Sequence, residues 1–366
     1  MRILVVNAGS SSLKLSVLDR DDELTAAREL PAPRSQFDEA ELSAALADVG
    51  AADAVGHRIV HGGRRYLGPV RVDDEVYAQL QELADLAPLH QAKSLETLAA
   101  VGRALPQVPA VACFDTAFHA QLPPGAATYA LPRQWRERFG LRRFGFHGLS
   151  HAYAARRAAE LVNRPLEQLR VVTCHLGAGA SLAAVHEGRS VDTTMGFTPL
   201  EGLVMATRSG SVDPGMLLWL LERGGIGEHE MTHALEYQSG IAALAGRAEM
   251  EDVISAAHTG DEGAQLALDV YLHRLRAGIA AMAAAMNGLD TLVFTGGVGE
   301  RAPAVRAGSA TGLRFLGIQL EPGLNNETAG KDADISTPGA PVRTLVITAR
   351  EDLEIARQVR EVLRSA

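Results

Sequence analysis

The sequence predicts an α/β protein built from two similar domains. Its 366 residues exceed the usual size of a single domain. Short apolar segments of strand type alternate with longer segments of helical periodicity, which is typical of sheets covered by helices. A third observation is a repeated motif, at residues 3–18 and again at 169–185, in which an apolar strand breaks into a loop of small residues and resumes.

The first half of the chain supplies the elements of one domain. We expect its strands at residues 3–6, 13–18, 23–30, 54–60 and 108–114, and its helices at residues 38–46, 73–86 and 94–104. Acidic residues open the segment 73–86, where they complement the positive end of a helix dipole. The proline-rich stretch 121–133 is the best candidate for the crossing between domains.

The second half repeats the alternation. We expect strands at residues 169–174, 182–185, 291–294 and 342–348, and helices at residues 150–163, 214–223, 228–235, 250–257, 261–287 and 351–363. Pro214 suits a first helical turn and Gly288 a helix stop. A glycine-rich turn at 296–299 follows a strand and precedes a further helix.

Composition excludes several classes of protein. Apolar residues make up 47% and charged residues 22%, as in an ordinary globular protein, and the net charge is −9. No Lys/Arg-rich run appears, so neither nucleic acid nor an anionic membrane is expected as a partner. Cys113 and Cys174 lie in apolar runs and read as buried thiols of a reducing compartment. The N-terminal apolar run is too short for a signal peptide and the apolar stretch 277–286 too short to span a bilayer, so we expect a cytoplasmic protein.

Three loops of small residues follow strands, at 7–14, 175–181 and 296–300. Gly and Ser let many backbone and hydroxyl donors approach one anion, as phosphate binding requires, although the first loop alone could be an ordinary hairpin tip. Ligands of α/β sheets bind at the carboxyl ends of strands, so two such hairpin loops could hold a polyphosphate from both sides. No Walker A pattern is present, and the third loop lacks the Rossmann glycine spacing.

A set of longer motifs gives a specific resemblance. They are Asn-Ala-Gly-Ser-Ser-Ser-Leu-Lys at 7–14, Gly-His-Arg-Ile-Val-His-Gly-Gly at 56–63, Ala-Pro-Leu-His at 87–90, Phe-Asp-Thr-Ala-Phe-His at 114–119, Arg-Phe-Gly-Phe-His-Gly-Leu-Ser-His at 143–151, Asp-Thr-Thr-Met-Gly-Phe-Thr-Pro-Leu-Glu-Gly at 192–202 and Thr-Arg-Ser-Gly at 207–210. In this order, and over essentially the whole chain to Glu351, they closely resemble the acetate kinase family.

The resemblance implies a fold and an activity. The fold would be the two-domain actin-like ATPase fold, a duplicated ribonuclease H-like unit with a cleft between domains, of the sugar kinase, Hsp70 and actin superfamily. One domain would be residues 1–118, completed by the C-terminal helix 352–366, and the other residues 119–351 with the nucleotide-binding loops. The activity would be reversible, Mg²⁺-dependent, in-line transfer of the ATP γ-phosphoryl group to acetate, giving acetyl phosphate and ADP, in a homodimer.

The resemblance also assigns residues by their match to the family motifs. The catalytic residues would be Arg58, Asp115, His147 and Arg208, and the metal-associated ones Asn7 and Glu351, for Mg²⁺ with Mn²⁺ as an alternative. The acetate pocket would be formed by Arg58, Val60, Leu89, His90, Phe146 and Pro199. The ATP site would include Ser10, Ser12, Lys14, His175, Leu176, Gly177, Ala178, Gly179, Gly297, Val298, Gly299, Glu300 and Arg301.

Phosphoryl transfer to a carboxylate explains these residue types. The nucleophile is already ionised at neutral pH, so Asp115 is better interpreted as a positioning or metal-linked group than as a general base. Arg58 and Arg208 offer planar bidentate grips for carboxylate and phosphoryl oxygens. His147 could donate to an equatorial oxygen in the transition state, and Mg²⁺ prefers oxygen ligands and retains waters.

Some of these residues also have structural interpretations. His147 and His151 are four residues apart like zinc ligands, but one helical turn supplies only two ligands, so we favour a functional His147, a structural His151 and no zinc. His57 and His61 are more simply packing or hydrogen-bonding residues.

The chain departs from the family pattern at three places. Ala178 stands where the second loop of the family has Asn, no Asp-x-Arg motif occupies residues 246–252, and Gln91-Ala92 replace Asn-Pro. These departures concern mainly the donor side, so we predict a weakened or altered selectivity for purine nucleotides.

Alternative functions remain open at this stage. A propionate or butyrate kinase is one, because a methylene is worth only about 1–3 kcal/mol in a pocket. A relative that uses another phosphoryl donor is a second, and a nucleotide-binding regulatory or structural protein on the same fold is a third. The joint presence of Asn7, Arg58, Asp115, His147, Arg208 and Glu351 favours an enzyme.

Overall fold

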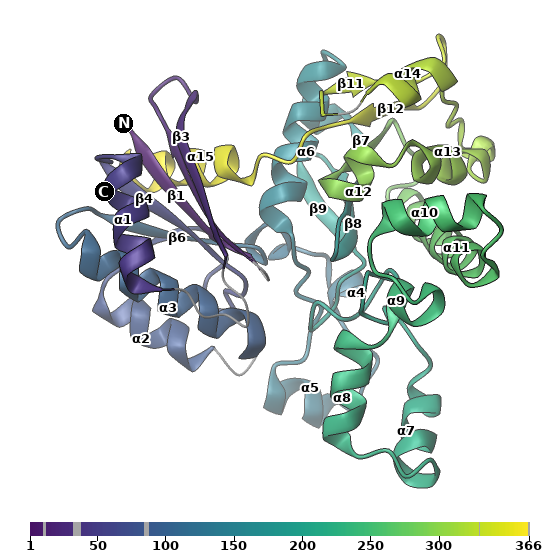
Figure 1. The fold of residues 1–366 in the computed structure, drawn as a ribbon, viewed down its shortest axis with the longest axis horizontal. Coiled ribbons are helices and arrows are strands. Elements are labelled where there is room, and N and C mark those ends of the chain that lie inside the picture. Colours follow the sequence, from purple (N-terminus) through teal and green to yellow (C-terminus); the bar gives the residue numbers. More distant parts are fainter. Residues whose placement is uncertain (10–11, 32–37, 84–87, 329, 365–366) are drawn as a thin grey trace. The chain divides into compact units, whose positions relative to one another are not determined.

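A computed structural model describes residues 1–9, 12–31, 38–83, 88–328 and 330–364, without the side chains of residues 39 and 88–90 (Figure 1). The chain forms two compact units. Unit 1 comprises Met1–Ala120, Phe146–Tyr153 and Arg350–Ala366, and unit 2 comprises Gln121–Gly145 and Ala154–Ala349.

The stretch Phe146–Tyr153 lies in unit 1, whereas the sequence-based division placed it in the second domain. Two contacts hold it there. The Gly148 N–H donates to the Asp115 carbonyl at 2.9 Å, and Leu149 is buried in the same apolar cluster as Ile355 of the C-terminal helix. Such long-range pairing leaves no local signal in the sequence.

Unit 1 is built on a six-stranded mixed sheet. Its strands are β1 (Ile3–Ala8), β2 (Ser12–Leu18), β3 (Leu24–Pro31), β4 (Ala54–Ile59), β5 (Val70–Arg71) and β6 (Ala110–Phe114), in the order β3-β2-β1-β4-β6-β5. The predicted opening hairpin is confirmed: β1 and β2 pair antiparallel with Asn7 opposite Lys14. Strands β1, β4 and β6 run parallel, so their carboxyl ends share one edge.

Helices cover both faces of this sheet (Figure 1). They are α1 (Glu39–Val49), α2 (Asp74–Glu82), α3 (Pro88–Ala104) and α15 (Glu351–Arg364), with the 3₁₀ turn η3 (Ala117–His119) after β6. Helices α1 and α3 pack on the face that carries Leu4 and Val6, and α15 packs on the face of Ile3 and Val5. Helix α15 can approach β4 closely because Gly56 has no side chain. A β-carbon at that position would lie only 2.4 Å from Ile355.

Two helix boundaries in unit 1 differ from the predictions. Helix α3 begins at Pro88 rather than at residue 94, because proline is well suited to a first helical turn. Helix α2 ends at Glu82, and residues 84–86 of the predicted helix lie outside the described residues. Asp38 and Asp73 cap α1 and α2 by accepting backbone N–H groups.

Unit 2 repeats the sheet of unit 1. Its strands are β7 (Arg170–Leu176), β8 (Ala180–His186), β9 (Arg189–Thr193), β10 (Thr291–Thr295), β11 (Ala333–Asp334) and β12 (Arg343–Val346), in the order β11-β12-β10-β7-β8-β9. Starting from β9, the strands follow the same order as the corresponding strands of unit 1. Both sheets have an antiparallel hairpin at one side, parallel strands in the centre and an antiparallel strand at the other edge. The predicted internal repeat is therefore a repeat of sheet topology.

The helices of unit 2 are more numerous than the sequence predicted. They are α4 (Pro124–Ala127), α5 (Arg133–Phe139), α6 (Gly148–Leu161, begun in unit 1), α7 (Pro214–Arg223), α8 (Glu228–Tyr237), α9 (Gly240–Ala245), α10 (Met250–His258), α11 (Glu262–Ala285), α12 (Gly296–Arg301), α13 (Pro303–Thr311) and α14 (Pro322–Glu327), with 3₁₀ turns η4 (Leu166–Gln168) and η5 (Arg314–Leu316). The glycine-rich segment after β10 is itself helix α12, not a loop that precedes a helix. No helix within the described ranges is long and apolar enough to cross a membrane.

Candidate active site

Four side chains of unit 1 form one polar network at the carboxyl edge of the sheet. Asn7 comes from β1, Arg58 from β4, Asp115 from the residue after β6, and Glu351 from the first turn of α15. Arg58 donates to Oδ2 of Asp115 through Nε at 3.1 Å and Nη2 at 2.6 Å, and Nη1 donates to the Asn7 amide oxygen at 3.2 Å. Asn7 in turn donates to Glu351 Oε2 at 2.8 Å.

Charge compensation stabilises this network away from water. The Asp115 side chain is only 1% exposed and that of Arg58 15%, and Glu351 Oε2 lies 3.9 Å from Arg58 Nε. Burial acts to lower the pKa of Arg58, but the charges of Asp115 and Glu351 outweigh it and raise the pKa. Burial raises the pKa of Asp115 while Arg58 opposes that rise. The guanidinium is thus a fixed cation whose orientation is set on two sides.

The turn that carries His147 is attached to Asp115. His147 has a positive φ of 55°, which is uncommon for a residue other than glycine. The following Gly148 lies so close to Asp115 that a β-carbon there would come within 2.1 Å of the Asp115 carbonyl oxygen. The structure therefore brings the His147 backbone to the same edge of the sheet as the network.

Buried histidines and apolar residues surround that edge. Burial lowers the pKa of His57, His61 and His119 to about 4. Phe146 is 1% exposed and its ring meets the ring of His61 edge-on at 5.5 Å, while its carbonyl lies 3.1 Å from His119 Nε2. All the predicted acetate-pocket residues except Pro199 belong to unit 1, and of these Val60 and Phe146 are buried. Leu89 and His90 open α3, but their side chains lie outside the described ones.

Two residues of α3 that motif comparison did not identify as functional support this edge. Gln91 accepts from the His61 N–H at 3.1 Å and donates to the His61 carbonyl at 3.0 Å, so one amide fixes both polar groups of that residue. Lys93, 2% exposed, donates to the Gly9 carbonyl at 2.6 Å and so attaches α3 to the first loop. Both contacts join segments far apart in the sequence, so no local pattern predicts them. The one indication of a special role in the sequence was that Gln91 departs from the family pattern.

The predicted phosphate side of the first loop is described only in part. Ser10 lies outside the described residues. Ser12 donates to Glu29 at 2.6 Å, and Lys14 lies 3.9 Å from the same carboxylate with its side chain 60% exposed. A turn hydrogen bond from the Gly9 N–H to the Ser12 carbonyl, at 2.9 Å, closes the loop.

In unit 2 the second and third glycine segments meet at the end of β7. The second segment turns tightly, since Gly177 N–H donates to the Gly179 carbonyl at 2.9 Å. The third begins at Gly296, whose φ is +78° and where a β-carbon would lie 2.8 Å from the Leu176 carbonyl. His175 lies beside both, paired with Ser181 in β8 and Thr295 in β10. The exposed Ala178 contributes its carbonyl to the Ala206 N–H at 3.1 Å.

Helix α12 is held by its own acidic residue. Glu300 is buried and its Oε1 accepts from the Gly296 N–H and the Ala349 N–H, both at 3.0 Å. The Arg301 guanidinium folds over Gly297, where a β-carbon would lie 2.7 Å away, and Val298 accepts from Ala302. The buried Arg306, which sequence reasoning missed, donates to the carbonyls of Gly299 and Glu300, at 2.8 Å each.

Arg208 and Pro199 lie together in unit 2. Arg208 Nη1 donates to the Pro199 carbonyl at 3.3 Å and contacts Met205 Sδ at 3.7 Å. Burial lowers the pKa of Arg208, against the charges of Glu236 and Tyr237. The six residues that favoured an enzyme thus divide between units: Arg208 belongs to unit 2 and the other five to unit 1.

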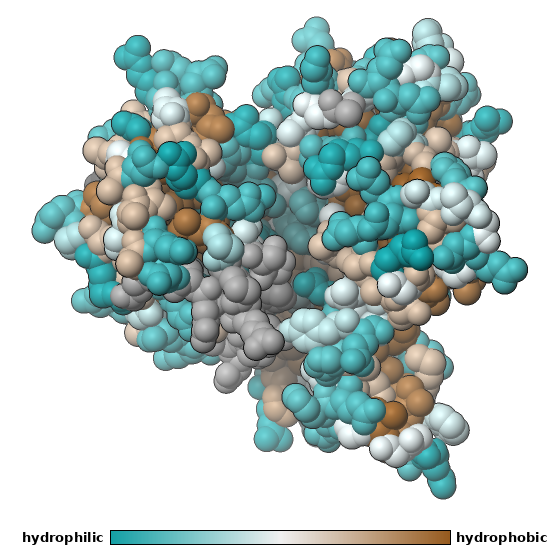
Figure 2. All heavy atoms as spheres, in the orientation of Figure 1, coloured by the Kyte–Doolittle hydropathy of each residue, from teal (hydrophilic) through white to brown (hydrophobic). Residues whose placement is uncertain are grey.

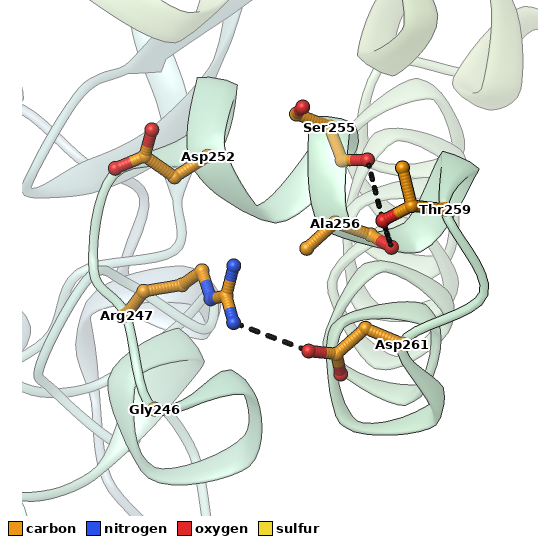
Figure 3. Close-up of a pocket in the computed structure, with 7 residues that line it drawn as sticks. All are labelled: Gly246, Arg247, Asp252, Ser255, Ala256, Thr259 and Asp261. Carbon is orange, nitrogen blue, oxygen red and sulfur yellow. Dashed lines mark hydrogen bonds and ion pairs between the residues drawn. The ribbon is translucent and has the colours of Figure 1, made fainter.

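A polar pocket of about 610 Å³ lies where α9, α10 and α11 meet (Figure 3). Its wall includes Arg247, which donates to Asp261 at 3.1 Å, and one face of α10 with Asp252, Ser255 and Thr259. Arg247 belongs to the stretch 246–252, which holds no Asp-x-Arg motif of the family type. Arg247 therefore does not occupy the position of the motif arginine, and its guanidinium is paired with Asp261.

The unit 1 network has the donor chemistry of a hydrated Mg²⁺ site. Mg²⁺ is bound by oxygen through one or two carboxylates and keeps several waters. Asn7 offers an amide oxygen, which accepts from Arg58, and Glu351 offers a carboxylate, which accepts from the Asn7 amide nitrogen; Asp115 lies beside them. Within the part of the chain that the structure describes, no three His, Cys, Asp or Glu side chains are grouped to hold a metal ion directly.

The duplicated sheet and the polar residues at strand ends define the class of the protein. Two topologically equivalent mixed sheets, each opened by a hairpin with a glycine loop, are the architecture of the actin-like kinases and ATPases. The chain belongs to the acetokinase family, whose sequence model matches residues 34–357.

Individual relatives agree with this assignment over nearly the full length. The acetate kinase of Thermotoga maritima is 42% identical over 402 aligned residues, with 99% of each chain covered. Among solved structures, Porphyromonas gingivalis acetate kinase has a TM-score of 0.91 at 34% identity, covering 99% of both chains. A propionate kinase from Francisella tularensis has a TM-score of 0.89 at 31% identity, covering 98% of both.

Proposed function

We propose that the protein is an acetate kinase, which transfers the γ-phosphoryl group of ATP to acetate and catalyses the reverse reaction. The observation that carries the proposal is the unit 1 network, in which Arg58 is fixed as a cation between Asp115 and Asn7 in a chain of the acetokinase family. Full-length relatives named acetate kinase support the choice of acid.

The proposed reaction needs positioning and charge neutralisation more than proton transfer. Acetate attacks as a carboxylate, so no side chain has to remove a proton. Arg58 and Arg208 would neutralise the carboxylate and the phosphoryl oxygens, and His147 would donate to an equatorial oxygen as charge develops there. Asp115 would act through Arg58, since both oxygens of its carboxylate lie within 3.3 Å of that guanidinium.

The metal fits the same edge of unit 1. Bound Mg²⁺ would supply charge neutralisation of the phosphates, held by Asn7 and Glu351 with water ligands between protein and ion. Mn²⁺ prefers the same oxygen donors. The orientation of both side chains is already set by their mutual hydrogen bond of 2.8 Å.

The loops of small residues within each unit are the residues that we assign to ATP binding. Ser10, Ser12, Lys14 and the segment Gly177–Gly179 would contact phosphates through small donors, and helix α12 with Gly297 and Gly299 would allow a close approach of the nucleoside. We propose a relaxed donor selectivity, because Ala178 lacks an amide donor and Arg247 is paired with Asp261.

A homodimer is part of the proposal, and helix α7 supports it. Its six large apolar residues, 216–221, surround the whole helix, yet no residue of α7 is buried. Leu218 is 58% and Trp219 60% exposed, and Figure 2 shows the hydrophobic side chains of this surface at the lower end of unit 2. A helix apolar on all sides requires a cover, and we assign that role to a second copy of the chain.

The proposal is tested by trapping acyl phosphate as a hydroxamate, with ATP, Mg²⁺ and acetate, propionate or butyrate in parallel. Product with acetate at the highest kcat/KM is expected. Product only with propionate or butyrate would favour the second candidate, a propionate or butyrate kinase. The similarity to the Francisella propionate kinase supports this candidate. The absence of product with every acid would leave a non-enzymatic nucleotide-binding role.

A further inference from the structure

Glu201 joins two side chains of one segment of unit 2, Gln121–Gly145, that is distant from it in the sequence. Its Oε1 accepts from Arg143 Nη2 at 2.7 Å, and its Oε2 accepts a short hydrogen bond from the Tyr129 hydroxyl. The Arg143 guanidinium also lies over the Tyr129 ring, 5.6 Å from its centre. The Arg143 side chain is 17% exposed, so the ion pair is shielded on one side.

Both partners of Glu201 hold the backbone of one loop, residues 194–199. Arg143 Nη1 donates to the carbonyls of Thr194 and Met195 at 3.0 and 3.1 Å. The Tyr129 oxygen accepts from the Phe197 N–H at 2.9 Å. Three backbone groups of the loop are therefore fixed by the two side chains that Glu201 joins.

Gly196 shows how closely the carboxylate packs on this loop. A β-carbon at Gly196 would lie 1.7 Å from Glu201 Oε2 and 2.2 Å from the Tyr129 hydroxyl. The Gly196 carbonyl accepts from the N–H groups of Phe144 and Gly145 at 3.0 and 3.3 Å. The cluster thus also holds the segment that continues into Phe146.

The residues fixed in this way lead to the proposed acid-binding groups. Pro199 belongs to the fixed loop, and its carbonyl accepts from Arg208 Nη1 at 3.3 Å. A shift of the loop would move the Pro199 ring and release the guanidinium together. Neither Tyr129 nor Glu201 has to touch the substrate to have this effect.

We propose that Glu201, with Tyr129 and Arg143, is a positioning residue that sets the discrimination between acetate and longer carboxylic acids. The inference rests on the proposed function, because Pro199 is a residue of its predicted acid pocket and Arg208 one of its proposed catalytic residues. Loosening the loop allows the pocket to accept an added methylene, and a methylene is worth about 1–3 kcal/mol when a pocket discriminates well.

The test compares Tyr129→Phe and Glu201→Gln with the wild type. Tyr129→Phe removes the hydroxyl that serves both Glu201 and Phe197, and Glu201→Gln removes the charge opposite Arg143 at nearly constant size. Tyr271→Phe is the matched control, because the Tyr271 hydroxyl is buried in the same unit and has no hydrogen-bond partner among the described residues. For each protein kcat and KM are measured with acetate, propionate and ATP.

We expect both variants to raise the KM for acetate and to lower the ratio of kcat/KM for acetate over propionate at least about fivefold. The KM for ATP should stay within about twofold, and Tyr271→Phe should leave every constant unchanged. A purely structural role would lower both acid activities in equal proportion and leave the ratio intact, which overturns the inference. An active wild type with unchanged variants overturns the inference alone, whereas a wild type that makes no acyl phosphate overturns the proposed function with it.

Discussion

Gly148 and Asp115 are joined backbone to backbone: the Gly148 N–H donates to the Asp115 carbonyl at 2.9 Å, and a β-carbon on Gly148 would lie 2.1 Å from that oxygen. This contact attaches the turn with His147 to the end of β6. It requires glycine for space, since the obstructing atom belongs to the backbone and cannot rotate away.

The first prediction is that Gly148→Ala displaces the His147 turn. We expect kcat to fall about 100-fold, because a shift of about 1 Å at a positioned group has that effect, and the free energy of unfolding to fall by about 1–3 kcal/mol. Gly102→Ala is the control, since nothing lies within 4 Å of a β-carbon at that position of α3. It should keep full activity; a Gly148→Ala enzyme that also does so would refute the role of this contact.

The second prediction concerns Arg208. Replacing it by Ala should reduce turnover by several orders of magnitude, because a cation that neutralises the transferring group is worth that much in phosphoryl transfer. The fold should survive the substitution. Circular dichroism and thermal unfolding of Arg208→Ala check the fold, and Arg314→Ala, an exposed arginine of the same unit, controls for the loss of a charge. An unchanged kcat would contradict the assigned role.

The third prediction is a loss of stability in mild acid. His57, His61 and His119 have pKa values of about 4 in the folded protein, below the ordinary value of 6.5. Below about pH 6.5 the unfolded chain therefore binds protons that the folded chain does not. The free energy of unfolding should fall as the pH drops from about 6.5 towards 4, by about 1.4 kcal/mol per pH unit for each histidine.

Denaturant unfolding at pH 7.5, 6, 5 and 4.5 measures this dependence. His119→Gln retains a donor for the Phe146 carbonyl and should flatten the slope by about one third, given three equal contributions. Equal slopes for wild type and His119→Gln would show that this histidine is protonated when folded.

The sequence anticipated the fold where local pattern determines structure. The two hairpins follow from apolar alternation on either side of small-residue loops. Helices α7 and α10 begin at the predicted residues, and Pro214 marks the first turn of α7. Helix α12 was missed because three glycines in six residues have low helix propensity; its start is held instead by Glu300, through a contact four residues away.

The residues of the candidate site were predicted from their match to family motifs, and not from local sequence pattern alone. Resemblance identified Asn7, Arg58, Asp115 and Glu351, and the structure shows them in one network; their roles stay predictions. No local pattern could identify Gln91 or Lys93, because each acts on a backbone group at least 30 residues away.

The fourth prediction concerns the phosphoryl donor. Rates with ATP, GTP and pyrophosphate should differ less than in an enzyme with a complete purine site, and a strict preference for ATP would count against the altered donor side. Ala178 is exposed and its backbone carbonyl is already bonded to Ala206, so Ala178→Asn can add an amide donor without disturbing the loop. One added hydrogen bond is worth about 0.5–1.5 kcal/mol, so the KM for ATP should fall about 2- to 12-fold. The KM for acetate should not change, and an effect on acetate instead would place the second loop on the acid side.

The fifth prediction tests the cover of helix α7. If a second copy buries this helix, the wild type should have the mass of a dimer in light scattering coupled to size-exclusion chromatography. Trp219→Glu would then place a charge in an apolar interface, which is costly unless the charge is paired, and should yield a monomer at micromolar concentration. Phe315→Glu is the control, because Phe315 is 74% exposed on η5 of the same unit and outside α7; it should remain a dimer. A wild-type monomer would refute the proposed dimer, and a Trp219→Glu dimer of unchanged dissociation constant would show that another surface forms it.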